Sequence, residues 1–135
     1  MTPHGARAAD RAHVAAPTTT YVGLLAERAA ARFLEHRGLA TIARNYRTRF
    51  GEIDLVMREG DATVFVEVRY RRDDSRLTGA ASITARKRKR IVLAARAFLR
   101  AHPSLAERPC RFDVVGISRP DYRLRYEWIR DAFVL

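Results

Sequence analysis

The residues from Gly51 to Arg71 alternate apolar and polar side chains on both sides of a central Gly-Asp pair, and this pattern constrains the fold most. The segments GEIDLVMRE and ATVFVEVRYR each show the period of two that is typical of a β-strand. Gly60 and Asp61 between them suit a two-residue turn of type II′, because glycine accepts its first position. We therefore expect an antiparallel hairpin in which Glu59 pairs with Ala62.

This turn sets the pairing of the two strands, because a slip of one residue would exchange their faces. It places Asp54 opposite Glu67 and Glu52 opposite Arg69, all on one face. The other face is apolar and should be buried; it consists of Ile53, Leu55, Met57, Val64, Val66 and Val68.

The facing carboxylates of Asp54 and Glu67 repel one another across the ladder. A metal ion, an arginine or plain solvent can compensate. Mg²⁺ commonly takes one or two carboxylates together with waters and substrate phosphate, which fits this pair. A solvated polar face with a cross-strand ion pair between Glu52 and Arg69 explains the same spacing.

Helical periodicity appears on both sides of the hairpin. A first helix begins at Tyr21 and ends before Gly38, a residue type common after helix C-termini. A second runs from about Thr84 to Ala101, with Thr84 as N-cap and Pro103 beyond its end. The apolar stripe expected on the first helix consists of Val22, Leu25, Ala26, Ala29, Ala30, Phe33 and Leu34.

The remaining segments complete a single α/β domain over residues 21–135. Leu39–Tyr46 is a further candidate strand, as are RFDVVGI and, less decisively, YEWIRDAFV. A long helix between two strands is the crossover that a parallel pair requires. We therefore expect a mixed sheet flanked by helices, in the order αβββαβ. Residues 1–20 are expected to form a disordered tail, and residues 70–78 a polar loop.

Charge indicates an anionic partner. The chain has 26 Lys and Arg against 15 Asp and Glu, for a net charge of +11. Lys87 and Lys89 are its only lysines, and arginine, which binds phosphate with a planar fork, favours nucleic acid over a membrane. A surface made basic for solubility is the alternative.

Several classes of protein are disfavoured by what the sequence lacks. The single cysteine, Cys110, leaves no internal disulfide and no cysteine zinc cluster. The four histidines are not spaced as metal ligands; they are His4, His13, His36 and His102. No signal peptide or transmembrane run is apparent, so a cytoplasmic location is the expectation.

The hairpin, the basic helix after it and the RFDVV strand together resemble the YraN-like family (uncharacterised protein family 0102). The resemblance runs from about Tyr21 to the C-terminus, and includes Gly-x-x-Ala-Glu-x-x-Ala around Glu27 and the lysine at 87. That family is similar to the restriction-endonuclease-like superfamily, archaeal Holliday-junction resolvases included. The superfamily motif is an Asp, a spacer and Glu-x-Lys. Here it stands as Asp54, twelve residues, Glu67, Val68 and Arg69.

The resemblance implies a restriction-endonuclease-like core and a metal-dependent nuclease site. Asp54 and Glu67 would hold Mg²⁺ or Mn²⁺, with the Val68 carbonyl as a third ligand and Glu27 as an extra one. The chain departs from the motif at Arg69, because arginine stays protonated and cannot act as a base. It could still neutralise charge in the transition state.

Lys87 is a candidate to replace the missing lysine. It shares a helical face with Ile91, Ala94 and Phe98, so its amine either reaches the acidic site or snorkels to solvent. The basic side chains expected to contact nucleic acid are Arg86, Lys89 and Arg90 on the helix and Arg71 and Arg72 after the hairpin. Asp113 matches the family pattern, and a structural role is expected for it.

The leading hypothesis is a metal-dependent DNA endonuclease, with branched DNA as one candidate substrate. The alternatives are a nucleic-acid-binding module that has the fold without turnover, and a partner-binding adaptor. The sequence leaves open DNA against RNA, and monomer against homodimer.

Overall fold

The computed structural model describes residues 21–71, 83–119 and 123–134, so the predicted N-terminal tail and Arg72 lie outside the described residues. The helices are α2 (Tyr21–Glu35), α3 (Ala85–Ala101) and the short α4 (Pro103–Ala106). The strands are β1 (Ala40–Arg47), β2 (Glu52–Glu59), β3 (Ala62–Arg71), β4 (Cys110–Ser118) and β5 (Arg125–Phe133). Strand β3 extends two residues into the segment that was predicted to be a loop, which corrects that boundary.

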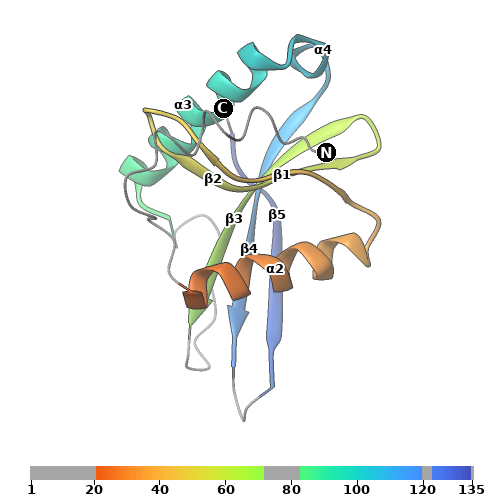
Figure 1. Cartoon of the computed structure of the whole chain (residues 1–135), viewed down its shortest axis with the longest axis vertical. Helices are drawn as coiled ribbons and strands as arrows, with labels where there is room; N and C mark the ends of the chain where they lie inside the picture. Colours follow the sequence, from red (N-terminus) through yellow and green to blue (C-terminus); the bar gives the residue numbers. More distant parts are fainter. Residues whose placement is uncertain (1–20, 72–82, 120–122, 135) are drawn as a thin grey trace.

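The described strands form one mixed sheet in the order β1-β2-β3-β4-β5. Strands β3 and β4 are parallel and are joined through α3, whereas the other neighbouring pairs are antiparallel. Figure 1 shows β3, β4 and β5 as three long strands that run in nearly the same direction, while β1 and β2 cross them at an angle. The prediction of an α/β fold with a mixed sheet is confirmed.

The central hairpin has the predicted register. Glu59 pairs with Ala62, and the pairing continues to Leu55 with Val66. Gly60 has a φ of +59°, the positive value that the first position of a type II′ turn requires.

Both long helices end as the sequence predicts. Gly38 has a φ of +99°, and the Leu39 N–H donates to the Leu34 carbonyl at 3.1 Å, which is the long bond of a Schellman motif. The Thr84 hydroxyl accepts from the Lys87 N–H at 3.1 Å and caps α3.

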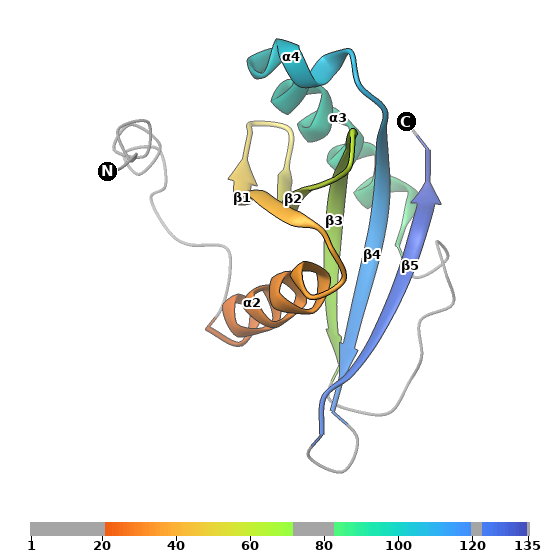
Figure 2. The same ribbon diagram turned by 90° about the vertical axis from the view of Figure 1, so that its right-hand side faces the viewer.

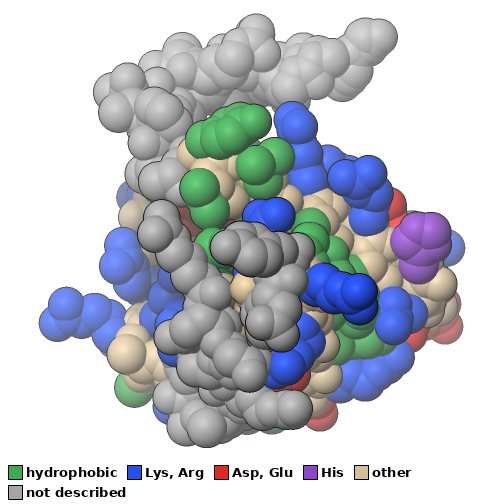
Figure 3. All heavy atoms as spheres, turned by 90° about the horizontal axis from the view of Figure 1, so that it is seen from below, with side chains coloured by type: hydrophobic (Ala, Val, Ile, Leu, Met, Phe, Trp, Pro, Cys, Tyr) green, Lys and Arg blue, Asp and Glu red, His purple; other side chains and the backbone are tan. Residues whose placement is uncertain are grey.

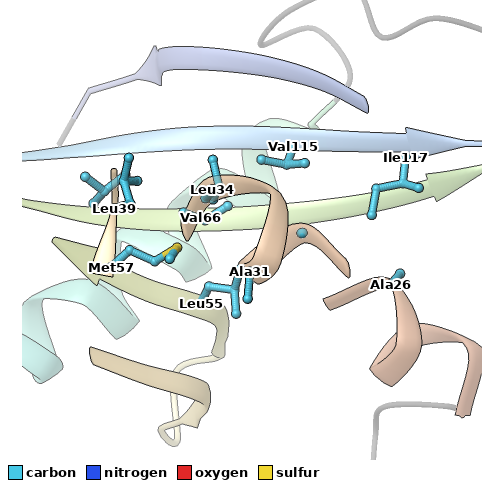
Figure 4. Packing of buried hydrophobic residues seen from close by; sticks show 11 residues of the cluster. Ala26, Ala31, Leu34, Leu39, Leu55, Met57, Val66, Val115 and Ile117 are labelled. Carbon is cyan, nitrogen blue, oxygen red and sulfur yellow. The ribbon is translucent and has the colours of Figure 1, made fainter. Parts of the chain in front are cut away.

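Helices cover both faces of the sheet (Figure 2). Helix α2 packs Ala30, Ala31 and Leu34 on one face (Figure 4), against Leu55, Met57, Val64, Val66, Val115 and Ile117. Helix α3 packs Ile91, Ala95 and Phe98 on the other, against Ile53, Val56, Phe65 and Phe112. Farther along the hairpin from Asp54 and Glu67, the same face is apolar, because Val56 and Phe65 pack there against α3.

Most of the apolar stripe predicted for α2 lies against the sheet. Ala26, Ala30 and Leu34 are buried, and Ala29 and Phe33 pack against the same core while partly buried. The exceptions are Val22 and Leu25, which are exposed. Glu27 and Ala31, which the predicted stripe left out, are buried, so the buried face is rotated toward Glu27.

In strands β1 and β2, the alternation of side chains between the two faces of the sheet is interrupted at the pair formed by Asn45 and Asp54. In β1, both Ala43 and Tyr46 pack on the α3 side, and in β2 both Ile53 and Val56 do. Side chains three residues apart should lie on opposite faces of a regular strand. The alternation therefore breaks between them, and Ile53 leaves the predicted face. Asn45 has a φ of +49°, a left-handed conformation that asparagine tolerates better than most residues.

Asp113 has the structural role that was expected of it. Its carboxylate is fully buried and accepts from Trp128 Nε1 at 2.9 Å, from the Asp131 N–H at 2.9 Å and from Arg111 Nε at 3.0 Å. These contacts join β4 to β5 where their register shifts between Phe112 and Val114. No helix among the described residues is long and apolar enough to cross a membrane.

Candidate functional site

The candidate site lies at a fork in the sheet. The ladder between β2 and β3 ends at Leu55 and Val66, while β3 stays paired with β4 as far as Arg71 and Ser118. A cavity of about 380 Å³ occupies this fork between the N-terminal parts of α2 and α3. Its lining consists of Gly23, Glu27, Gly51, Glu52, Asp54, Glu67, Val68, Lys87, Arg90 and Ile91.

Asp54 bridges the two strands at the fork, although it is not directly paired with Glu67 as the hairpin pattern predicts. Its Oδ2 accepts the Val68 N–H at 2.8 Å. Because the N–H and C=O of one strand residue project to the same edge, the Val68 carbonyl also lies on the cavity side. Burial raises the pKa of Asp54 well above its usual value, and the charge of Glu67 adds to the rise.

Glu27 reaches the cavity from the buried face of α2. Its side chain is only 7% exposed, and its Oε1 has no hydrogen-bond partner among the described residues. Burial raises the pKa of Glu27, while side-chain hydrogen bonds from Asn45 and with Asp54 lower it.

Glu27, Glu52 and Asp54 form a compact group of oxygen donors. One carboxylate oxygen from each lies within 4.8 Å of the other two. From the sequence, Glu52 was placed opposite Arg69 and was not assigned to the site; an ion pair between the two was the alternative to a metal site. The partner of Glu52 is instead Arg47 on β1, at 3.9 Å. The available signal was the position of Glu52, two residues before Asp54 on the same strand.

Lys87 points into the acidic site, which confirms one of the two orientations that its helical face allowed. Its Nζ lies 3.0 Å from Glu67 Oε2. The Glu67 side chain is 5% exposed and that of Lys87 is 48% exposed, so the amine reaches in from solvent to a buried carboxylate. The Thr84 cap sets the first turn of α3 and hence the direction of this side chain.

Of the other predicted basic residues that the structure describes, one lies in the cavity lining and the rest lie outside it. Arg90 lines it and lies against Gly51, where an added Cβ would meet the Arg90 Cβ at 3.2 Å. Arg86 and Lys89 are exposed on α3 outside the lining, and half-buried Arg71 lies at the end of β3. Arg69 of β3 pairs with Gly116 of β4 and is also outside the cavity lining.

The arrangement suits a divalent cation. Four carboxylates meet in the cavity beside Lys87 and Arg90, and the buried Oε1 of Glu27 has no hydrogen-bond partner in the part of the chain that the structure describes. Oxygen donors of this kind are the ligands that Mg²⁺ prefers, and Mn²⁺ binds similar sets. The residues present therefore fit such an ion.

The fold and the cavity define a class: an α/β protein with a five-stranded mixed sheet and an acidic site at the fork between two of its strands. Residues 26–117 match the model of a family described as uncharacterised protein family UPF0102. The chain belongs to this family.

Relatives in two bacterial genera agree with this assignment. A UPF0102 protein of Xanthomonas euvesicatoria pv. vesicatoria is 57% identical over 111 residues, which cover 82% of this chain and 89% of the relative. One from Xylella fastidiosa (strain M12) is 52% identical over 114 residues, which cover 84% of this chain and 92% of the relative.

Proposed function

We propose that this protein binds nucleic acid and hydrolyses phosphodiester bonds in DNA with Mg²⁺ or Mn²⁺. The observation that carries the proposal is the meeting of Asp54, Glu67 and Lys87 at one cavity, from two strands and a helix. An aspartate, a glutamate and a lysine that converge in this way resemble the motif of restriction-endonuclease-like nucleases, with Lys87 supplying the cation from α3.

The carboxylates of the cavity, one backbone carbonyl and Lys87 each have a part in this function. Asp54, Glu67 and the Val68 carbonyl would hold the ion, with Glu27 and Glu52 beside Asp54 as further oxygen donors. A bound ion of this kind lowers the pKa of a coordinated water and stabilises negative charge on phosphate oxygens. Lys87 keeps a positive charge at the same cavity, where it can stabilise the charge that develops on the substrate phosphate.

The basic surface favours a polyanionic substrate. Lys and Arg side chains are spread over the coloured part of the face shown in Figure 3, with few acidic ones among them. Arg86, Lys89 and Arg90 lie on either side of Lys87 along α3 and can contact successive phosphates. The proposal includes DNA or RNA as the substrate and the cytoplasm as the location.

One observation favours the alternative, a binding module without turnover. Arginine occupies position 69, where the related motif has lysine, and Arg69 is outside the cavity lining. If catalysis needs a lysine at that position of β3, the protein binds DNA without cutting it.

A cleavage assay distinguishes the two. Purified protein is incubated with linear, flapped and four-way DNA in Mn²⁺ or in EDTA, beside Glu67→Gln as a near-isosteric control. The proposal predicts Mn²⁺-dependent cleavage by the wild type and its loss in Glu67→Gln, with DNA binding retained by both. Tight binding without cleavage of any substrate would select the binding module. No binding at low salt would reject both.

A further inference from the structure

Asn45 occupies a special position in β1, at the edge of the candidate site. Its neighbours Arg44 and Tyr46 pair with Leu55 and Ile53, so Asn45 lies directly opposite Asp54. Its φ of +49° is where β1 turns over. The turn keeps the side chains of Ala43 and Tyr46 on the α3 side and leaves Asn45 and Asp54 at the fork.

The positive φ at position 45 does not by itself explain why the residue is an asparagine. Glycine adopts a positive φ at lower energy than any other residue, and it would allow the same turn. Asparagine adds an amide, and this amide hydrogen-bonds to the Glu27 side chain. An ionised carboxylate can only accept hydrogen bonds, so the amide N–H is the donor to the Glu27 carboxylate.

An amide suits this contact better than a charged donor would. Glu27 lies beside Glu52 and Asp54, and their repulsion would turn its side chain away if nothing held it. Lysine or arginine could hold it, but a positive charge there would repel a cation. The neutral amide orients the carboxylate without this penalty. The Oε1 of Glu27 meanwhile is buried and has no hydrogen-bond partner within residues 21–71, 83–119 and 123–134.

We propose that Asn45 is a positioning residue of a divalent-cation site: its amide holds the Glu27 carboxylate in place, so that the second oxygen is available to the ion. The inference rests on the proposed function for the presence of the ion, and it adds a residue outside the Asp-Glu-x-Arg motif. Partners that orient a metal ligand in this way contribute about 10- to 100-fold in metal affinity.

The test measures Mn²⁺ affinity at neutral pH, from the electron paramagnetic resonance signal of free Mn²⁺. Asn45→Gly keeps the left-handed backbone accessible and removes the amide. Asp131→Gly is the matched control, because Asp131 also has a positive φ, of +52°, on the distant strand β5. We expect a loss of about 10- to 100-fold for Asn45→Gly and wild-type affinity for Asp131→Gly.

A double-mutant cycle separates positioning from a general loss of structure. In a Glu27→Gln background, Asn45→Gly should cause little further loss, because the ligand that Asn45 orients is already gone. Wild-type affinity in Asn45→Gly would overturn the inference, as would a loss of the same size in both backgrounds. Wild-type protein that binds Mn²⁺ but cleaves nothing would reject the nuclease and leave Asn45 in its role. Failure of the wild type to bind Mn²⁺ would reject both.

Discussion

The substitution Lys87→Met removes the amine that reaches Glu67 and keeps an unbranched side chain of similar length. Nζ and Oε2 are 3.0 Å apart, Glu67 is 5% exposed and Lys87 is 48% exposed. A hydrogen bond to a charged group contributes about 1.5–3 kcal/mol, and the solvent around Lys87 reduces that figure. We therefore expect Lys87→Met to lower the free energy of unfolding of the ion-free protein by about 1–2 kcal/mol.

The same substitution should have opposite effects on ion binding and on cleavage. Without Lys87, Glu67 is free to bind the ion and a repelling charge is gone, so Mn²⁺ should bind on the order of tenfold more tightly. Cleavage should nevertheless become about 10- to 1000-fold slower, the range for the loss of one preorganised charge. Tighter binding of the ion with slower chemistry is a combination that simple unfolding cannot produce.

Lys89→Met is the matched control, because Lys89 is the other lysine of the chain and is exposed on α3 outside the cavity lining. Urea unfolding in EDTA, calorimetric Mn²⁺ titration and single-turnover cleavage are measured on both variants. If Lys87→Met matched Lys89→Met in cleavage rate, or bound Mn²⁺ more weakly than the wild type, the role assigned to Lys87 would be refuted.

Three further predictions concern pH, salt and the motif arginine. Because the pKa of Asp54 is raised, its contribution to the stability of the ion-free protein is lost as pH rises from its usual value of 3.8 through the raised one. Asp54→Asn should therefore gain stability over the wild type with increasing pH; equal urea midpoints at every pH in EDTA would argue against this. Arg86→Glu with Lys89→Glu should weaken DNA binding and flatten its salt dependence, whereas an unchanged slope in fluorescence anisotropy would place the phosphates elsewhere. Arg69→Lys should keep or raise the cleavage rate; cleavage that appears only in this variant would mean that the natural protein is a binding module.

Features set by neighbouring residues could be predicted from the sequence. Gly60 and Asp61 determine the hairpin register, and Thr84 and Gly38 mark helix ends through bonds within a few residues. Lys87 was also found from the sequence, because a cation on an apolar helical face needs a partner or a route to solvent.

Features that depend on where strands separate could not be predicted in this way. An alternating pattern does not show that the ladder ends after Leu55, or that β1 and β2 turn over at Asn45 and Asp54. Both depend on how α3 packs against the sheet. As a result, the face of Ile53 and the place of Glu52 in the site were missed. A polar residue that tolerates positive φ, in the middle of a predicted strand, was the signal available for Asn45.

An anomalous difference map from crystals grown with MnCl₂, recorded above the manganese absorption edge, tests the central claim most directly. The account predicts the strongest peak inside the cavity at the fork, in contact with carboxylate oxygens of Asp54 and Glu67, and its loss in Asp54→Asn crystals. A protein that cleaves DNA while its manganese peaks lie only outside this cavity would contradict the account.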